Sequence, residues 1–187
     1  MELGEIWEKM VNGEEYDATH IGLRDLLHVT RMKLWKFNNL SPDQQDEMND
    51  ILKGLFGSIG ERFIINQPFR CDYGCNIFLG EDCFINFNCT ILDEAKVSIG
   101  EHAFIGPNVS IFTACHPLEP EPRNLFIEWA RPVTIGNNVW IGGNVTILPG
   151  VTIGDNVTIG AGSVVTKSFP SDVVIAVNPA KIINTLR

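Results

Sequence analysis

A six-residue repeat constrains the fold of this chain more than any other feature of its sequence. An aliphatic residue leads each repeat in the second half of the chain: Ile135, Ile141, Ile147, Ile153, Ile159 and Val165. Valine stands four residues after each of the first four leads, and glycine directly follows four of the leads. Neither the 3.6-residue period of a helix nor the two-residue period of a strand gives this spacing. Such repeats are typical of a parallel β-helix, whose coils bury aliphatic side chains and turn at glycine.

The same spacing extends upstream, with interruptions. Three leads precede a step of eight residues and three follow it: Leu79, Ile85, Ile91, Ile99, Ile105 and Ile111. The register resumes at Ile135 after a stretch rich in proline and charge, which predicts a loop extruded from the coils over residues 113–132. We therefore expect a mainly β protein, with a β-helix over residues 59–170 that includes this loop and a C-terminal segment over residues 171–187.

Residues 1–58 follow a helical period instead. Apolar side chains recur there at steps of three and four, as in Leu23, Leu26, Leu27, Thr30, Leu34 and Phe37. The sequence Ser41-Pro42-Asp43 offers an N-cap followed by proline, which is typical of a helix start. An N-terminal helical segment of two or three helices is therefore predicted ahead of the β-helix.

The charge balance limits the partners of the chain. Its 14 Lys and Arg residues face 23 Asp and Glu residues, which gives a net charge of −9, and no two basic residues are adjacent. Because polyanions are bound by clustered positive charge, neither nucleic acid nor an anionic membrane surface is expected as a partner. The longest apolar run, residues 173–177, is far shorter than the roughly 18 residues needed to cross a bilayer.

The five cysteines fit a reducing compartment. The first residues, MELGE, lack the basic start and apolar stretch of a signal peptide, which predicts a cytoplasmic location. Cys75, Cys83, Cys89 and Cys115 take the fourth place of a repeat and Cys71 a lead place, where small thiols suit the coil interior. Their spacing does not match a structural zinc site.

Among the four histidines, His116 has the position most suited to chemistry. It stands at the start of the extruded loop, at the edge of the coils, where a side chain can face a cleft. His20 and His28 lie in the helical segment, and His102 follows a coil corner. Position alone leaves both an inert and a catalytic His116 open.

Short motifs along most of the chain carry a resemblance to one enzyme family. The helical segment holds GEEYD at residues 13–17, and the first coils hold FRCDYG at residues 69–74. From the loop onward come TACHP at 113–117, PVTIGNNVWIGG at 132–143 and GAGSVVTK at 160–167. Together these motifs resemble the maltose and galactoside O-acetyltransferases of the hexapeptide superfamily.

The resemblance implies a left-handed β-helix and transfer of acetyl from acetyl-CoA to a hydroxyl of a small acceptor, such as a maltose-, glucose- or galactoside-like sugar. Acetyl-CoA is then a co-substrate, no metal is required for catalysis, and the subunits form a homotrimer with active sites between them. His116 becomes the general base. That role suits the chemistry, because a sugar hydroxyl attacks a thioester at neutral pH only when a base takes its proton.

The resemblance also assigns residues to the coenzyme. Trp140 precedes a lead isoleucine, so its ring is expected at the coil surface, where it walls the thiol end of the coenzyme or packs against a neighbouring subunit. The Gly143 amide is the candidate donor to the oxyanion. Further residues follow the coenzyme toward its nucleotide end: Ala161, Thr166, Lys167 and Lys181. The alternative for Lys167 is a solvated corner residue.

On the acceptor side, the resemblance points to carboxylates and an amide, which bond sugar hydroxyls in pairs. These residues are Asp17, Asp72, Asn86, Asp93 and Glu94, with Glu94 able to substitute for Asp93. Asp17 could instead cap a helix. In the trimer, His116 of one subunit is expected to face Asn86 and Asp93 of another.

The loop tip departs from the family pattern. Leu125, Phe126 and Ile127 follow Arg123-Asn124 where the family usually reads Ser-Gly. This apolar tip lines the expected site, so the identity of the acceptor stays open.

Two other functions compete with the transferase. A metal-dependent hydratase resembling the γ-carbonic anhydrases needs three histidines on adjacent coils, and the coil region offers His102 and His116 alone. A non-catalytic assembly protein would keep the aliphatic repeat, but it would have no reason to retain His116, Asn86 and Trp140 together.

Overall fold

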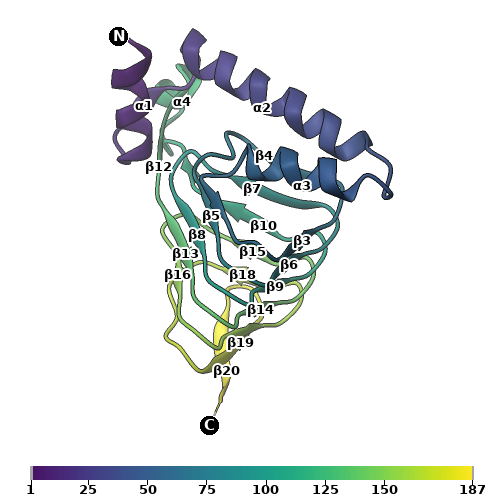
Figure 1. Cartoon of the computed structure of the whole chain (residues 1–187). Helices are drawn as coiled ribbons and strands as arrows, with labels where there is room; N and C mark the ends of the chain where they lie inside the picture. Colours follow the sequence, from purple (N-terminus) through teal and green to yellow (C-terminus); the bar gives the residue numbers. More distant parts are fainter. Residues whose placement is uncertain (1, 187) are drawn as a thin grey trace.

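The repeats form a three-sided stack of coils, with helices at its N-terminal end (Figure 1). The computed structural model describes residues 2–186. Each full coil gives one strand to each of three parallel sheets. Ile135 pairs with Ile153 and Ile141 pairs with Ile159, which is the eighteen-residue spacing of three repeats. The parallel β-helix predicted from the repeat is confirmed.

The three coil sheets are numbered by their order along each coil. The first sheet contains β2 (Ser58–Ile59), β5 (Ile77–Leu79), β8 (Val97–Ile99), β13 (Val133–Ile135) and β16 (Thr152–Ile153). The second contains β3 (Phe63–Ile65), β6 (Cys83–Ile85), β9 (Phe104–Ile105), β14 (Trp140–Ile141), β17 (Thr158–Ile159), β19 (Val173–Ala176) and the antiparallel edge strand β20 (Lys181–Thr185). The third contains β4 (Phe69–Cys71), β7 (Cys89–Leu92), β10 (Ser110–Phe112), β15 (Thr146–Ile147) and β18 (Val164–Val165).

The lead residues fill the interior of the coils. The six leads from Ile135 to Val165 are each at most 1% exposed, and the valines between them are equally buried. The residue before a lead points outward, as Thr134 and Trp140 do. Burial of one such aliphatic side chain stabilises the fold by about 1.5–3 kcal/mol, so the stacked leads form the continuous core that joins the three sheets. Because β19 pairs in parallel with β17, this coil structure runs to Ala176, beyond the expected boundary at residue 170.

Three helices cover the N-terminal end of the core: α1 (Leu3–Val11), α2 (Ile21–Asn39) and α3 (Gln45–Lys53). Apolar side chains of α2 and α3, among them Phe37 and Leu52, pack in one buried cluster with Phe69 of the first coil. The third helix starts later than Ser41-Pro42 predicts, because residues 41–44 form a turn closed by the Gln44 N–H on the Ser41 carbonyl at 2.9 Å. No helix within residues 2–186 is long and apolar enough to span a membrane.

A smaller cluster joins α1 to the start of α2 and to the first coil: Ile6, Met10, Tyr16, Leu23 and Tyr73. Trp7 meets the Tyr73 ring edge to face, with ring centroids 5.1 Å apart. Tyr73 lies in the turn between β4 and β5, so α1 is held against one particular corner of the stack.

The extruded loop carries secondary structure of its own. β11 (Ala114–Cys115) and β12 (Ile127–Ala130) pair antiparallel, with α4 (Pro120–Asn124) between them. β1 (Tyr16–Asp17) adds to the other edge of β12, which explains why α1 and α4 lie together in Figure 1. The Arg123 Nη1 atom donates to the Pro117 and Leu118 carbonyls at 3.0 and 2.9 Å. The loop is therefore a fixed ribbon.

The prediction of interior cysteines is only partly confirmed. All five are free thiols, and Cys71, Cys83 and Cys89 are buried. Cys75 is exposed and Cys115 is partly buried. Cys75 lies in a coil corner and Cys115 in the loop ribbon, outside the regular strands whose repeat positions point into the core.

The core predicts the effect of a single truncation. Ile147 is fully buried in β15, between Ile111 of β10 and Val165 of β18. Ile147→Ala is expected to lower the free energy of unfolding by about 2–5 kcal/mol, because it leaves a cavity between coils. Thr152→Ala, at an exposed position, is the control and should stay within about 0.5 kcal/mol. Denaturant unfolding followed by circular dichroism measures both, and equal stability of the two variants would contradict this account of the core.

Candidate active site

Three successive coils widen at the same corner, between the third and the first sheet. The first two widened turns lie between β4 and β5 and between β7 and β8, and the loop ribbon leaves the third coil after β10. Since β4, β7 and β10 are neighbours in the third sheet, these three segments stack on one another. The step of eight residues in the sequence register marks this corner, which we call the acidic corner after Asp72, Asp93, Glu94 and Glu128.

Asp93 is fully buried and holds the acidic corner together. Its Oδ1 atom accepts hydrogen bonds from the Asp72 and Tyr73 N–H groups at 3.0 and 2.9 Å, and Oδ2 accepts one from the Asn76 N–H at 3.3 Å. Burial raises the pKa of Asp93 to about 6, although these bonds favour its charged form. Both carboxylate oxygens are thus used by the turn, a structural role that the resemblance did not suggest.

Glu94 is the neighbouring buried carboxyl. Burial and a hydrogen bond to Asp72 raise the pKa of Glu94, so the pair favours holding a proton. The Thr113 hydroxyl lies 3.0 Å from Glu94 Oε2 and donates to the Leu92 carbonyl at 2.8 Å. Asp72 and Glu94 are therefore adjacent in space, as their shared assignment to the acceptor requires.

His116 lies at the exposed edge of the same corner. Its Nε2 atom is 3.5 Å from Glu128 Oε2, and the side chains are 54% and 13% exposed. Glu128 Oε1 accepts a hydrogen bond from the Tyr16 hydroxyl, which comes from the facing strand β1. Burial raises the pKa of Glu128, whereas the Tyr16 bond and His116 favour its charged form. A half-buried carboxylate thus orients an imidazole whose other edge meets solvent, an arrangement suited to a general base.

Sequence reasoning missed Glu128 and Tyr16 as partners of His116. Tyr16 and Glu128 are 112 residues apart and meet only because β1 joins the loop ribbon. Tyr16 lies inside the GEEYD motif, so the sequence drew attention to this segment but did not indicate that Tyr16 contacts Glu128. Asp17 is exposed, and its carboxylate accepts from the Thr19 N–H and hydroxyl at 2.8 and 2.7 Å, which lowers the pKa of Asp17. It shapes the turn before α2 rather than contacting His116.

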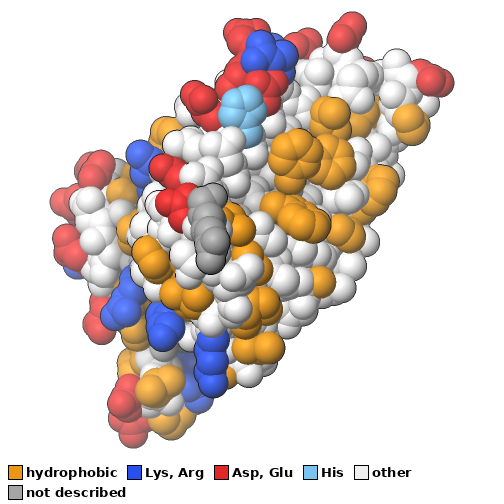
Figure 2. Space-filling model, turned by 90° about the horizontal axis from the view of Figure 1, so that it is seen from below, with side chains coloured by type: hydrophobic (Ala, Val, Ile, Leu, Met, Phe, Trp, Pro, Cys, Tyr) orange, Lys and Arg blue, Asp and Glu red, His pale blue; other side chains and the backbone are white. Residues whose placement is uncertain are grey.

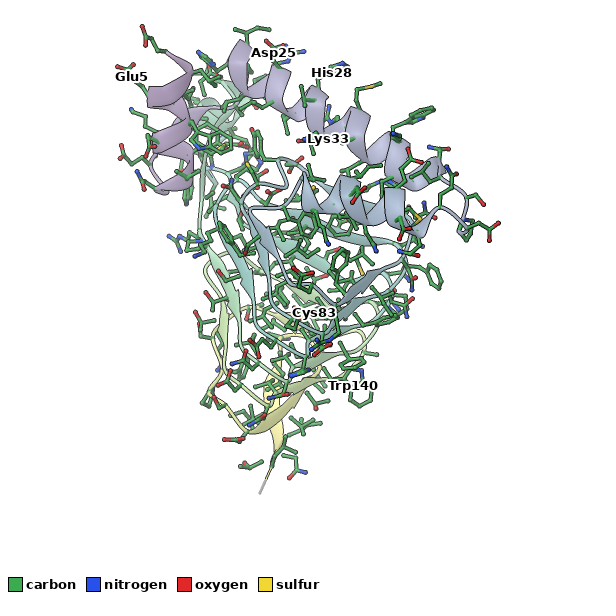
Figure 3. The ribbon with its side chains drawn as sticks, viewed as in Figure 1. Glu5, Asp25, His28, Lys33, Cys83 and Trp140 are labelled. Carbon is green, nitrogen blue, oxygen red and sulfur yellow. The ribbon has the colours of Figure 1, made fainter. Side chains whose placement is uncertain are left out.

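A groove of about 480 Å³ lies at a different corner, where the second sheet turns into the third. Four residues predicted from the resemblance line it together: Asn86, Trp140, Gly143 and Ala161. Trp140 is 61% exposed and projects outward from β14, and Phe84 and Phe104 line the groove beside it (Figure 3). Figure 2 shows hydrophobic side chains gathered on one side of the stack. The groove offers an apolar wall to a flexible ligand.

Gly143 and Asn86 each present a polar group to this groove. Within residues 2–186 the Gly143 N–H has no hydrogen-bond partner, and a Cβ atom at Gly143 would come within 3.2 Å of the Pro107 carbonyl oxygen. Asn86 Oδ1 accepts from the Phe87 N–H at 2.8 Å and from Asn66 Nδ2 at 3.5 Å, which leaves Asn86 Nδ2 as a donor. A free N–H beside an apolar wall suits an oxyanion.

The other predicted coenzyme residues lie outside the groove lining. Thr166, Lys167 and Lys181 are exposed near the C-terminal end of the stack. The Ala180 N–H donates to the Val164 carbonyl at 2.8 Å, which brings Lys181 close to Thr166 and Lys167. The Lys167 ammonium lies 5.7 Å from the Phe169 ring centroid. Lys167 and Lys181 therefore place two positive charges near the C-terminal end of the stack.

One chain does not bring His116 and the groove together. They lie at opposite edges of the third sheet, separated by β10, which spans about 10 Å. His116 is absent from the groove lining, and the hydrogen bonds of Asn86 join it to Asn66 and Phe87. Among the described residues, no group of three or more His, Cys, Asp or Glu side chains could hold a metal ion.

Known proteins match the chain over almost its whole length. Residues 9–60 match the maltose acetyltransferase hexapeptide capping motif, and residues 132–167 match the bacterial transferase hexapeptide (six repeats). A putative acetyltransferase of Saccharomyces cerevisiae is 48% identical over 184 residues, which covers 97% of this chain and 93% of the relative. The chain belongs to the hexapeptide-repeat acetyltransferases.

Two solved structures resemble this acetyltransferase closely. A maltose O-acetyltransferase from Clostridium difficile 630 has a TM-score of 0.96 and 46% identity, and the match covers 97% of each chain. A galactoside acetyltransferase in complex with coenzyme A has a TM-score of 0.94 and 37% identity, and the match covers 97% of this chain and 91% of that one. The left-handed β-helix expected from the resemblance is confirmed.

The hydrogen bonds of Asp93 predict how its replacement acts. Asp93→Ala removes the acceptor of three N–H groups, of which the Tyr73 N–H is buried and the other two are partly buried, and is expected to cost at least about 2 kcal/mol of unfolding free energy at pH 8. Asp93→Asn keeps one carbonyl acceptor and should cost less. Denaturant unfolding compares both with the wild type, and a fully stable Asp93→Ala variant would contradict this role.

The pH dependence has a defined sign. Because the pKa of Asp93 in the folded protein lies near 6, above its ordinary value of 3.8, protonation of Asp93 favours the folded state. The stability of the wild type relative to Asp93→Asn should therefore be highest below about pH 4 and fall as pH rises through about 6. A difference that grows with pH over this range would show that burial does not dominate at Asp93.

Proposed function

We propose that this acetyltransferase moves the acetyl group of acetyl-CoA to a hydroxyl of a sugar-like acceptor, in the cytoplasm, at a site shared by two subunits of a homotrimer. The observation that carries the proposal is the His116–Glu128 pair at 3.5 Å on the exposed edge of the acidic corner. The similarity to a maltose O-acetyltransferase and to a galactoside acetyltransferase solved with coenzyme A supports both substrates.

The described residues divide the chemistry between them. His116 takes the proton of the acceptor hydroxyl as the hydroxyl oxygen attacks the thioester carbonyl, and Glu128 holds the imidazole in place. Charge then develops on the carbonyl oxygen, where the Gly143 N–H is the candidate donor. As the carbon–sulfur bond breaks, the imidazolium returns the proton to the leaving thiolate, which balances the transfer.

The two binding regions suit the two substrates. In the groove, Trp140 and the phenylalanines beside it can pack on the flexible arm of the coenzyme, with Ala161 at its edge. Thr166, Lys167 and Lys181 then lie where its phosphates need positive charge. In the acidic corner, the carboxyls of Asp72 and Glu94 offer paired hydrogen bonds to sugar hydroxyls, with Asp93 fixing their turn and Asp17 at the rim.

A second subunit completes the site in this proposal. His116 and the groove lie at different corners of one three-sided stack, so a thioester in the groove is out of reach of its own His116. Packing the exposed apolar face of one copy against the loop ribbon of another would place His116 beside Asn86 and Gly143. Threefold symmetry closes this arrangement after three copies.

Replacement of His116 tests its role as the general base. His116→Ala is expected to lower kcat by roughly 10²–10⁴, while affinity for acetyl-CoA and trimer stability stay near wild type, because the lost interaction exists only in proton transfer. Thiol release with a panel of sugars measures this effect. His102→Ala, which removes another exposed imidazole, is the matched control. Full activity of His116→Ala would remove this histidine from the mechanism.

Glu128→Gln tests the positioning of the imidazole in the same assay. This change keeps the shape of the side chain and removes its charge, so kcat should fall less than in His116→Ala, at an unchanged KM for acetyl-CoA. A kcat equal to that of the wild type, or a changed KM for acetyl-CoA, would contradict this positioning role of Glu128.

Mixed trimers test whether two subunits share the active site. His116→Ala and Asn86→Ala should each be nearly inactive, yet unfolding and refolding them together should restore about a quarter of wild-type activity, since that share of interfaces in random trimers joins two intact halves. Each variant refolded alone is the control. A site contained in one subunit predicts no recovery, and a monomer in sedimentation would also refute this arrangement.

A further inference from the structure

A second hollow, of about 780 Å³, lies between the flank of α2 and the tip of the loop ribbon. Its α2 side is lined by Arg24, Asp25, His28 and Arg31. The opposite side is formed by Ala18 and Thr19, which follow β1, and by Phe126 at the ribbon tip. Neither the acidic corner nor the coenzyme groove includes these residues.

The charge of this hollow is opposite to that of the chain. Arg24, His28 and Arg31 are spaced by four and three residues, so they share one face of α2. Within residues 2–186 neither guanidinium has a hydrogen bond or an ion pair, and Asp25 is the one carboxylate in the lining. Figure 3 shows Asp25 and His28 on the side of α2 that faces away from the coils. Two unpaired arginines therefore face solvent in a chain of net charge −9.

Phe126 adds an apolar surface held in an uncommon conformation. Its φ of 59° lies in the left-handed region that non-glycine residues rarely adopt. The Ala18 N–H donates to the Phe126 carbonyl at 3.1 Å, and the Phe126 N–H donates to the Arg123 carbonyl at 3.0 Å. These bonds fix the backbone and leave the ring 61% exposed toward the hollow.

The hollow continues from the proposed acceptor site. Phe126 stands two residues before Glu128 on the same ribbon, which corresponds to about 7 Å of extended chain. We propose that the hollow is a second acceptor subsite, which binds an oxyanion on the part of the acceptor beyond the acetylated sugar. This inference rests on the proposed function. The second unit of the acceptor packs on Phe126, and its carboxylate or phosphate pairs with Arg24 and Arg31, which bind planar oxyanions in a bidentate manner.

Aryl galactosides test this subsite, because a nitro group and a carboxylate have nearly the same shape and differ in charge. Wild-type kcat/KM should be about tenfold or more higher for the 4-carboxyphenyl or 4-phosphophenyl galactoside than for the 4-nitrophenyl galactoside. The larger of the two ratios shows which oxyanion fits. In the double variant Arg24→Gln/Arg31→Gln this preference should disappear. Equal rates in the wild type, or a preference that survives in the variant, would overturn the subsite.

Lys53→Gln is the matched control. Lys53 is exposed at the end of α3 and does not line the hollow, so its replacement makes the net charge of the chain more negative without changing the subsite. The preference should persist in this variant, and its loss there would assign it to long-range charge and overturn the proposal.

Calorimetric binding of the same three galactosides separates the subsite from the transfer reaction. If the wild type acetylates none of them, galactosides are ruled out as its acetyl acceptors, and binding still decides the subsite. Tighter binding of the charged galactosides that is lost in the double arginine variant supports it, and equal binding of all three refutes it.

Discussion

The in-register stacking of the lead aliphatic residues is the constraint on which the rest of this structure depends. Each lead must lie above the lead of the previous coil, because any shift would expose one row and open a void beside the next. Ile135 beside Ile153 and Ile141 beside Ile159 show this stacking in adjacent strands. The sheets leave no room for polar chemistry inside the coils, so the candidate chemistry gathers at the corners and on outward-facing side chains.

The acidic corner is where the chain leaves this regular repeat. Extra residues between β4 and β5 and between β7 and β8 bring buried carboxyls into one place, and burial raises the pKa of Asp93 and of Glu94. The Asp93 hydrogen bonds offset part of the cost of burying a charge. The loop ribbon extends from the acidic corner, and within it Glu128, held by Tyr16, fixes the position of His116.

The three-sided coil separates His116 from the groove, although the proposed transfer reaction needs the two close together. The groove with Trp140 and Gly143 lies at one edge of the third sheet, and His116 lies at the other. No side-chain rotation spans a packed sheet, so we propose that a neighbouring copy completes the site. In that proposal the apolar groove wall and the projecting ribbon are complementary parts of one site. The same ribbon carries Phe126 toward the flank of α2, where the proposed second acceptor subsite lies.

The six-residue period by itself determined the β-helix, the extruded loop and the outward position of Trp140, because regular spacing fixes which residues face outward on a coil. The resemblance supplied Gly143 and Ala161 for the coenzyme and Asn86 for the acceptor, and the structure brings all of them to one groove with Trp140. The step of eight residues after Ile91 was visible in the sequence as a shift in register, but the period did not predict the acidic corner that this shift marks. Tertiary structure alone decided that the Asp93 carboxylate accepts hydrogen bonds from a turn, that Glu128 contacts His116 and that Phe126 lines a hollow with Arg24. Those contacts join segments that are apart in the sequence, through the stacking of β4 on β7, the β11–β12 pairing and the β1–β12 pairing, and no local pattern encodes such pairings.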